Sequence, residues 1–248
     1  MEQSNISLNQ STEKAKLDSF TLAFTGEHKH LEDTYLGVYH KKSVKQQRFI
    51  FILAILVYGV FAWMDIISVP ERTTLFWFIR FALFTPLAFI ALSLTYTSYY
   101  YKYSQILISL FSFLGCAGLI AIHTIASQHG FYSYRYGIIF ILLFVIYLLR
   151  LRFIYVLATG VAIILLYNIV QWQVGVLPPD IHLDSNILFG FILLLGCISV
   201  YHSERLERIQ FYLNKLLEEE SEKVGAEGVS ESTENQSEVE KDKKGSKE

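Results

Sequence analysis

Polar side chains inside apolar stretches are the residues of this sequence best suited to chemistry. Asp65, Arg80, His123, Asn168 and Asn186 each lie within or at the end of a run of apolar residues. Such groups are costly at membrane depth, so they normally face a partner or a cavity. Asp65 and Arg80 lie at comparable depths on two consecutive apolar segments joined by a short loop. We therefore expect that these two side chains can pair.

Two interpretations of this polar set remain open. In the structural one, the side chains satisfy each other and fix the register of neighbouring helices, at about 1 kcal/mol or less per interhelical hydrogen bond. In the functional one, they line an outward-facing pocket for a small polar or anionic ligand, such as a lipid head group. His123 taken alone is more typical of a satisfied interfacial histidine than of a pH sensor.

The elements that must position these side chains are long apolar segments. Of the 248 residues, 52% are hydrophobic and only 18% are charged, which is unusual for a soluble protein. About 20 apolar residues in an α-helix cross roughly 30 Å of hydrocarbon. The predicted fold class is an all-α integral membrane protein, a six-transmembrane-helix bundle. The spans are expected at residues 49–69, 74–95, 106–127, 131–149, 153–173 and 186–201.

The distribution of basic residues predicts the orientation of this bundle. An even number of spans puts both termini on one side of the membrane. Lys and Arg gather near the span ends on that side, whereas the opposite side has only Arg72 and Arg135. By the positive-inside rule both termini are cytoplasmic. No cleavable signal peptide is expected, because the sequence before the first span is polar.

The segments that flank the bundle differ in composition. Residues 1–30 are expected to form a disordered or extended cytoplasmic N-terminus. Residues 31–48 predict an amphipathic pre-helix on the inner membrane surface or beneath the bundle, with a solvated linker helix as the alternative. Residues 202–223 contain neither Pro nor Gly, so one helix is expected to run from the last span into the cytoplasm. Residues 224–248 predict a disordered acidic tail.

The exit helix carries four apolar residues in three, four, three spacing, which is the a and d pattern of a coiled coil. Over only two heptads, any amphipathic helix that packs on a neighbour gives the same stripe. We interpret the stripe as the seam of a parallel homodimer. The residues assigned to this seam and to signal relay are Glu204, Leu206, Arg208, Ile209, Leu213 and Leu216.

Signatures of enzymes are missing from the sequence. It has no phosphate-binding Gly loop, no paired His motif and no nucleophile elbow. No catalytic residue, metal or cofactor is therefore predicted. Cys116 and Cys197 match no ligand spacing and are expected to be small buried hydrophobes. The lipid bilayer is the expected surrounding, and nucleic acid is not an expected partner because basic residues follow the membrane interface.

Several short stretches occur in an order typical of one family. In that order and spacing, across about residues 20–224, the chain resembles the six-helix membrane domain that precedes class III adenylate and guanylate cyclase domains in bacteria. The resemblance implies a receptor-like domain in the bacterial inner membrane whose exit helix feeds an output. The stretches are Leu31-Glu32 with Tyr35, Asp65, Trp77 to Arg80 with Pro86, Tyr136-Gly137, Arg150 to Phe153, Tyr167-Asn168, Asn186, and Tyr201 to Glu204 with Arg208 and Phe211.

The sequence departs from that family because no cyclase domain follows the exit helix. The resemblance then implies a sensor or regulatory subunit that acts through a partner such as a cytoplasmic signalling enzyme. A small transporter or channel is one alternative, although polar residues that stop in the outer half argue against a continuous path. A truncated, non-catalytic remnant of a membrane-bound cyclase is the other.

Overall fold

Apolar helices dominate the computed structural model, which describes residues 17–175 and 177–245. Within these ranges the fold is all-helical apart from one isolated β-bridge between Leu17 and Phe24. Five of the helices are long and apolar enough to cross a membrane. A further apolar helix, Arg135–Leu148, is shorter.

The last helix begins at Pro179, before the expected span 186–201, because proline fits the first turn of a helix. Two segments, η3 and η4, are π-helical. The elements are η1 (Gly26–His30), α2 (Leu31–Ser68), η2 (Pro70–Arg72), α3 (Thr73–Trp77), η3 (Phe78–Phe84), α4 (Thr85–Leu94), α5 (Tyr99–Ser127), α6 (Arg135–Leu143), η4 (Phe144–Leu148), α7 (Phe153–Val174) and α8 (Pro179–Gly245).

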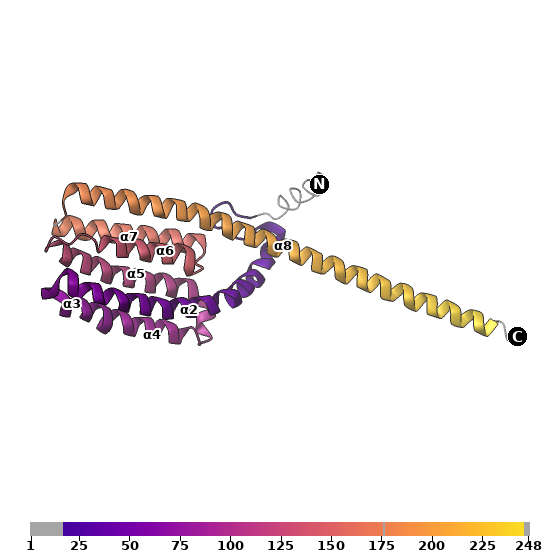
Figure 1. Ribbon diagram of the computed structural model, residues 1–248. Coiled ribbons are helices and arrows are strands. Elements are labelled where there is room, and N and C mark those ends of the chain that lie inside the picture. The colour runs from indigo at the N-terminus through magenta and orange to yellow at the C-terminus, as the bar shows by residue number, and fades with distance from the viewer. Residues whose placement is uncertain (1–16, 176, 246–248) are drawn as a thin grey trace.

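The helices run side by side around α5 (Figure 1). Half of the most apolar window of α5 is buried, against 22–28% for the other four long helices, so α5 is the central one. The N-terminal segment and the long extension of α8 lie at the same end of the bundle (Figure 1). We call this the exit end and the opposite end the far end.

The outer surface of the bundle is apolar. Large side chains such as Leu56, Val60 and Phe191 are 60–72% exposed, and Trp63 and Trp172 near the far end are 72% and 89% exposed. Soluble monomers rarely expose apolar surface on this scale. The surface is therefore compatible with that of a membrane protein.

The N-terminal segment is folded where the structure describes it. Leu22 and Phe24 are 1% and 2% exposed, and the Asp18 carboxylate accepts the N–H of Thr21 at 2.6 Å. The expectation of a disordered or extended N-terminus is wrong for residues 17–30, because Phe24 packs with residues of α2 and α8. For residues 1–16 that expectation lies outside the described residues.

The helix α8 also extends beyond the expected boundary. Residues 224–245, expected to be a disordered tail, continue the helix, while residues 246–248 lie outside the described part. No proline follows Pro179, and Glu, Lys and Ala are good helix formers. A helix that has already started propagates at little further cost.

The pre-helix and the first span form a single helix, α2. Its first turns curve toward α8 (Figure 1). The Ser43 hydroxyl donates to the Tyr39 carbonyl at 2.7 Å, a bond of the kind that bends helices. Tyr35, only 3% exposed, packs on Phe24 and Tyr212. The start of α2 is therefore held against the exit helix.

Candidate functional site

A buried ion pair near the far end joins α2 to η3. Nε and Nη2 of Arg80 donate to the two oxygens of Asp65 at 2.7 and 3.1 Å, and the side chains are 1% and 0% exposed. The Tyr134 hydroxyl donates to the same carboxylate at 2.9 Å. The guanidinium also lies 4.8 Å from the centre of the Tyr58 ring. The pair is neutral overall and fixes three segments relative to each other.

A π-helical segment carries Arg80 to this position. Pro86 has no N–H, so the helix before it cannot keep its full α-helical bonding. The sequence indicates a kink at this point, and the structure places the π-helix η3 there. The Thr85 hydroxyl donates to the Arg80 carbonyl at 2.9 Å. Such π segments are frequent at functional sites.

A second polar group joins α7 to α8 near the far end. The Asn168 amide donates to the Asn186 side-chain oxygen at 2.7 Å. Asn186 in turn lies 3.2 Å from the His182 ring, which stacks on Tyr167 with 5.7 Å between ring centres. These contacts set the register of the two helices.

His123 of α5 lies on Tyr167, with 6.0 Å between ring centres. It is 0% exposed, and neither ring nitrogen has a hydrogen-bond partner among the described residues. Nearby, the Gln171 amide donates to the Thr124 hydroxyl at 3.0 Å. His123 is thus enclosed by the bundle and does not contact the ion pair.

The five predicted intramembrane residues therefore form two groups instead of one network. The ion pair belongs to α2 and η3, whereas the amide pair and His123 belong to α5, α7 and α8. Sequence reasoning missed Tyr134 and His182 as members of these groups. Both lie near the starts of helices, where an aromatic or polar residue is typical of the membrane interface and does not by itself indicate a site.

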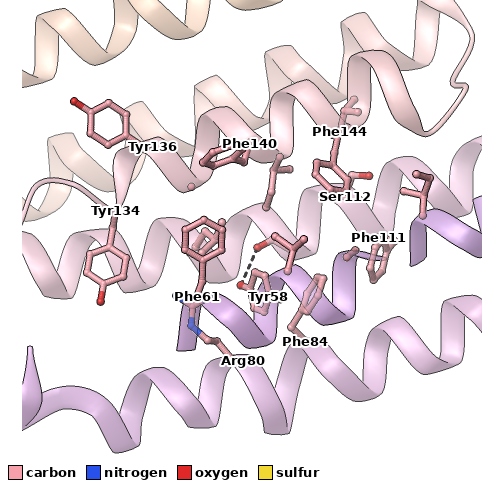
Figure 2. A pocket seen from close by; sticks show the side chains of 18 of the residues that line it. Tyr58, Phe61, Arg80, Phe84, Phe111, Ser112, Tyr134, Tyr136, Phe140 and Phe144 are labelled. Carbon is pink, nitrogen blue, oxygen red and sulfur yellow. Dashed lines mark hydrogen bonds between the residues drawn. The ribbon is translucent and has the colours of Figure 1, made fainter. Parts of the chain in front are cut away.

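A mainly apolar cavity of about 190 Å³ lies between α2 and α6. Phe111, Ser112 and other residues of α5 form one wall, and Arg80 lies at its polar end. Figure 2 shows Arg80 extending from its helix toward Tyr58 and the cavity. Phe61 of α2 and Phe140 of α6 meet with ring centres 5.8 Å apart. The cavity thus combines one cationic side chain with a long apolar body.

A charged network at the exit end surrounds Arg208 of α8. Arg208 is 0% exposed and donates to Glu32 at 2.7 and 3.2 Å and to Glu204 at 3.1 and 3.2 Å. Arg152, just before α7, donates to Glu204 at 3.2 Å. The Tyr35 ring lies 4.3 Å from the guanidinium. We call Glu32, Arg152, Glu204 and Arg208 the exit network.

The environment keeps Glu32 and Arg208 of the exit network charged. Burial raises the pKa of Glu32, but hydrogen bonds from Arg208 and the Phe24 N–H, together with the nearby positive charges, bring that pKa below its ordinary value. Burial lowers the pKa of Arg208, while Glu32, Tyr35 and Glu204 raise it by more. With two carboxylates and two guanidiniums, the network is neutral as a whole.

The turn before α7 is held by the same region. The second oxygen of Glu204 accepts the N–H of Phe153, the first residue of α7, at 2.7 Å; acidic groups are favourable at a helix N-terminus. The Tyr39 hydroxyl donates to the Arg150 carbonyl at 2.6 Å. Arg150 itself has a φ of 49°, which residues other than glycine rarely adopt. The exit network therefore links α8 to both α2 and the turn that starts α7.

The predicted dimer seam is divided between two environments. Leu206 is 60% exposed, whereas Ile209 is 9% exposed. Leu213 is half-buried, and Leu216 packs against the N-terminal aromatic cluster of this chain. Leu217 is 63% exposed. Leu206 and Leu217 thus remain available to another chain.

Sequence reasoning selected Glu204 and Arg208 as functional residues but not their partners Glu32 and Arg152. Glu32 lies 176 positions from Arg208, and no periodicity relates residues so far apart. Both partners belong to the stretches on which the family resemblance rests. Both residues lie near ends of predicted helices on the same side of the bundle. This shared position was the signal that could have indicated a common site.

Metal chemistry has no candidate site in the described ranges. Residues 17–175 and 177–245 contain no group of three or more His, Cys, Asp or Glu side chains that could hold a metal ion. Cys116 and Cys197 are both buried free thiols.

Comparisons of the chain with protein-family models, with curated proteins and with solved structures found no match.

Proposed function

We propose that this chain is a membrane-embedded sensor or transducer that relays the state of its bundle through α8 to a cytoplasmic signalling partner. The observation that supports this most directly is the course of α8. It is one helix from Pro179 to Gly245, and Arg208 and Glu204 tie it to α2 and to the start of α7 where it leaves the bundle.

In this proposal the chain crosses a bacterial inner membrane six times, with both termini in the cytoplasm. The fourth crossing along the chain, added to the five long helices, is the helix Arg135–Leu148, which at 1.5 Å per residue covers about 21 Å and is extended by the turns on either side. It lies against α5 and α8. Basic residues concentrate at the exit end, as the positive-inside rule requires of a cytoplasmic side.

The exit network makes a relay physically reasonable because buried charges tolerate few arrangements. A movement of α2 or of the α7 turn relative to α8 separates charges that the protein has removed from water. Breaking such a buried pair is strongly unfavourable unless a new arrangement satisfies both ions. The network therefore favours a small number of discrete positions of α8, and a stimulus that shifts the bundle selects among them.

The test measures the position of α8 directly. Nitroxide labels are placed at Val60→Cys on α2 and Leu217→Cys on α8, both exposed, in a chain whose two native cysteines are replaced by alanine. Pulsed electron paramagnetic resonance gives the distance distribution in nanodiscs. We expect Glu32→Gln to shift or broaden this distribution, because the charge that holds Arg208 is lost.

The matched control is Asp33→Asn, which removes one negative charge from the neighbouring, exposed position. It should leave the distance distribution unchanged. If Glu32→Gln gives the same distribution as the unmodified chain, the exit network does not set the position of α8, and the proposed relay is refuted.

A further inference from the structure

Arg80 has a donor group that the protein does not use. Two of its three nitrogens bind Asp65, while Nη1 has no hydrogen-bond partner among the described residues although the side chain is only 1% exposed. Buried polar groups are nearly always paired, so an unpaired one in a native fold requires an explanation. Arg80 lines the cavity between α2 and α6, so a small adjustment of its side chain brings the free donor to a molecule bound there.

The cavity has one polar end and a long apolar body. Near Arg80 its lining includes Tyr58, Ser68, Ser133 and Tyr134, whereas the rest, apart from Ser112 and two glycines, is apolar. On α2 the lining extends from Ile50 to Ser68, about 27 Å at 1.5 Å per residue. The volume of about 190 Å³ exceeds the roughly 150 Å³ of an engineered cavity that accepts benzene. These dimensions suit an extended chain with one polar group.

The side of the cavity is open toward the surroundings of the bundle. Three of its lining residues, Met64, Tyr136 and Phe140, are 48–49% exposed on the outer surface. In a bilayer that surface faces acyl chains, so a ligand can enter from within the membrane. Phe61 and Phe140 both line the cavity and contact each other, so this contact must adjust when a chain lies between α2 and α6.

We propose that this cavity binds a neutral single-chain amphiphile of the acyl-ester type. Its carbonyl oxygen accepts a hydrogen bond from Nη1 of Arg80, and its chain lies along the apolar body toward Leu149. The ligand is neutral because Asp65 already balances the charge of Arg80. An anion would leave a buried negative charge without a counter-charge. The anionic ligand considered from the sequence is therefore disfavoured at this site.

The inference deepens the proposed function, because this ligand would be what the bundle senses. Its signalling consequence depends on the proposed relay, whereas binding to the cavity does not.

The binding test uses the full chain in phosphatidylcholine nanodiscs and a photoreactive probe, 1-decanoylglycerol with a diazirine at the chain end. The matched anionic probe is decanoate with the same diazirine. We expect saturable labelling of cavity residues on α2 or α6 by the ester and much weaker labelling by the carboxylate. Ala54→Leu fills the cavity and should reduce ester labelling at least about tenfold, which corresponds to about 1.4 kcal/mol.

Two further variants separate packing from recognition. Ala82→Leu adds the same group at an exposed apolar position outside the cavity and should not change labelling. Arg80→Lys keeps a positive charge beside Asp65 but removes the free guanidinium nitrogen. It should therefore abolish the preference for the ester over a decane probe with the same diazirine, whether or not the total labelling changes.

Three results would overturn the proposal: unchanged labelling in Ala54→Leu, stronger labelling by the carboxylate than by the ester, or occupation of the cavity by a second copy. The last would appear as a disulfide between copies carrying Met64→Cys and Phe140→Cys, together with exclusion of the probe. Labelling that leaves the label distances on α8 unchanged would refute the relay and keep the site. An intact relay without labelling would refute the site alone.

Discussion

Replacing Asp65 by asparagine removes the counter-charge of a guanidinium that is 1% exposed. Asparagine has nearly the same shape and can still accept the hydrogen bond that Tyr134 donates. The main change is therefore electrostatic, since Arg80 is left with an uncompensated charge between α2 and η3. This variant isolates the energetic role of the buried ion pair.

The expected magnitude follows from the depth of the pair. Removing one partner of a buried, hydrogen-bonded ion pair typically costs about 3–5 kcal/mol, and replacing both partners by apolar residues of similar volume is often close to neutral. We therefore expect Asp65→Asn to lower the free energy of unfolding by about 3–5 kcal/mol. The double variant Asp65→Leu with Arg80→Met should recover most of that loss.

Unfolding can be measured by titrating sodium dodecyl sulfate into mixed micelles and following tryptophan fluorescence. Trp77 is a suitable reporter, because its indole N–H donates to the Ala62 carbonyl at 3.1 Å close to the pair. The control is Asp184→Asn, which breaks the pair with Arg135 at 3.3 Å; the Asp184 side chain is 61% exposed. An exposed pair of this kind contributes about 1 kcal/mol or less.

The reasoning fails if Asp65→Asn costs no more than the Asp184 control. That result would mean that water reaches Arg80 through the cavity and screens its charge. It would also fail if the double variant were less stable than Asp65→Asn alone, because the pair would then contribute more than mutual neutralisation.

Two further predictions concern the exit end. The pKa of Glu32 is below its ordinary value of 4.5, so its contribution to stability is present above pH 4.5 and is lost as the pH falls through the lower folded-state pKa. Hydrogen exchange of the first turns of α2 should therefore accelerate over that acidic range in the unmodified chain. A similar acceleration in Glu32→Gln would show that Glu32 is not its origin. If α8 pairs with a second copy, the double variant Leu206→Lys with Leu217→Lys should reduce the yield of cross-linked dimer at least about tenfold, or about 1.4 kcal/mol. The control Glu219→Lys changes the net charge by the same amount and should not reduce that yield. Equal dimer yields in the unmodified chain, the double variant and the control would exclude this face.

The apolar helices could be predicted because about 20 consecutive apolar residues indicate a helix long enough to cross a membrane, whereas hydrophobicity did not give the end of α8 at Gly245. The depth argument also led to Asp65 and Arg80, which the structure places 2.7 Å apart. Two residues on consecutive antiparallel helices have a fixed relation once the helix starts are known. The amide pair of Asn168 and Asn186 follows similarly from helices that are neighbours in sequence.

Contacts between distant segments could not be predicted in the same way. Nothing in the sequence near Glu32 indicates that its partner is Arg208, because the folding of the whole bundle brings them together. That residues 17–30 are folded was not predicted for a related reason. Phe24 lies in a polar, turn-rich context, and packing against α2 and α8 supplies the apolar contacts that offset the entropy of ordering this segment.

The length of α8 has a mechanical consequence. From Tyr201 to Gly245 the helix adds about 66 Å at 1.5 Å per residue, and the exit network lies near the beginning of that stretch. A helix of this length acts as a lever arm with its pivot at Arg208. From Arg208 to Gly245 the helix covers about 56 Å at 1.5 Å per residue, so a tilt of about 5° at the pivot displaces its tip by about 5 Å, on the order of one helical turn. In the proposed relay, rearrangements inside the bundle that are smaller than a side chain would thereby be amplified into displacements large enough to alter contacts with another protein.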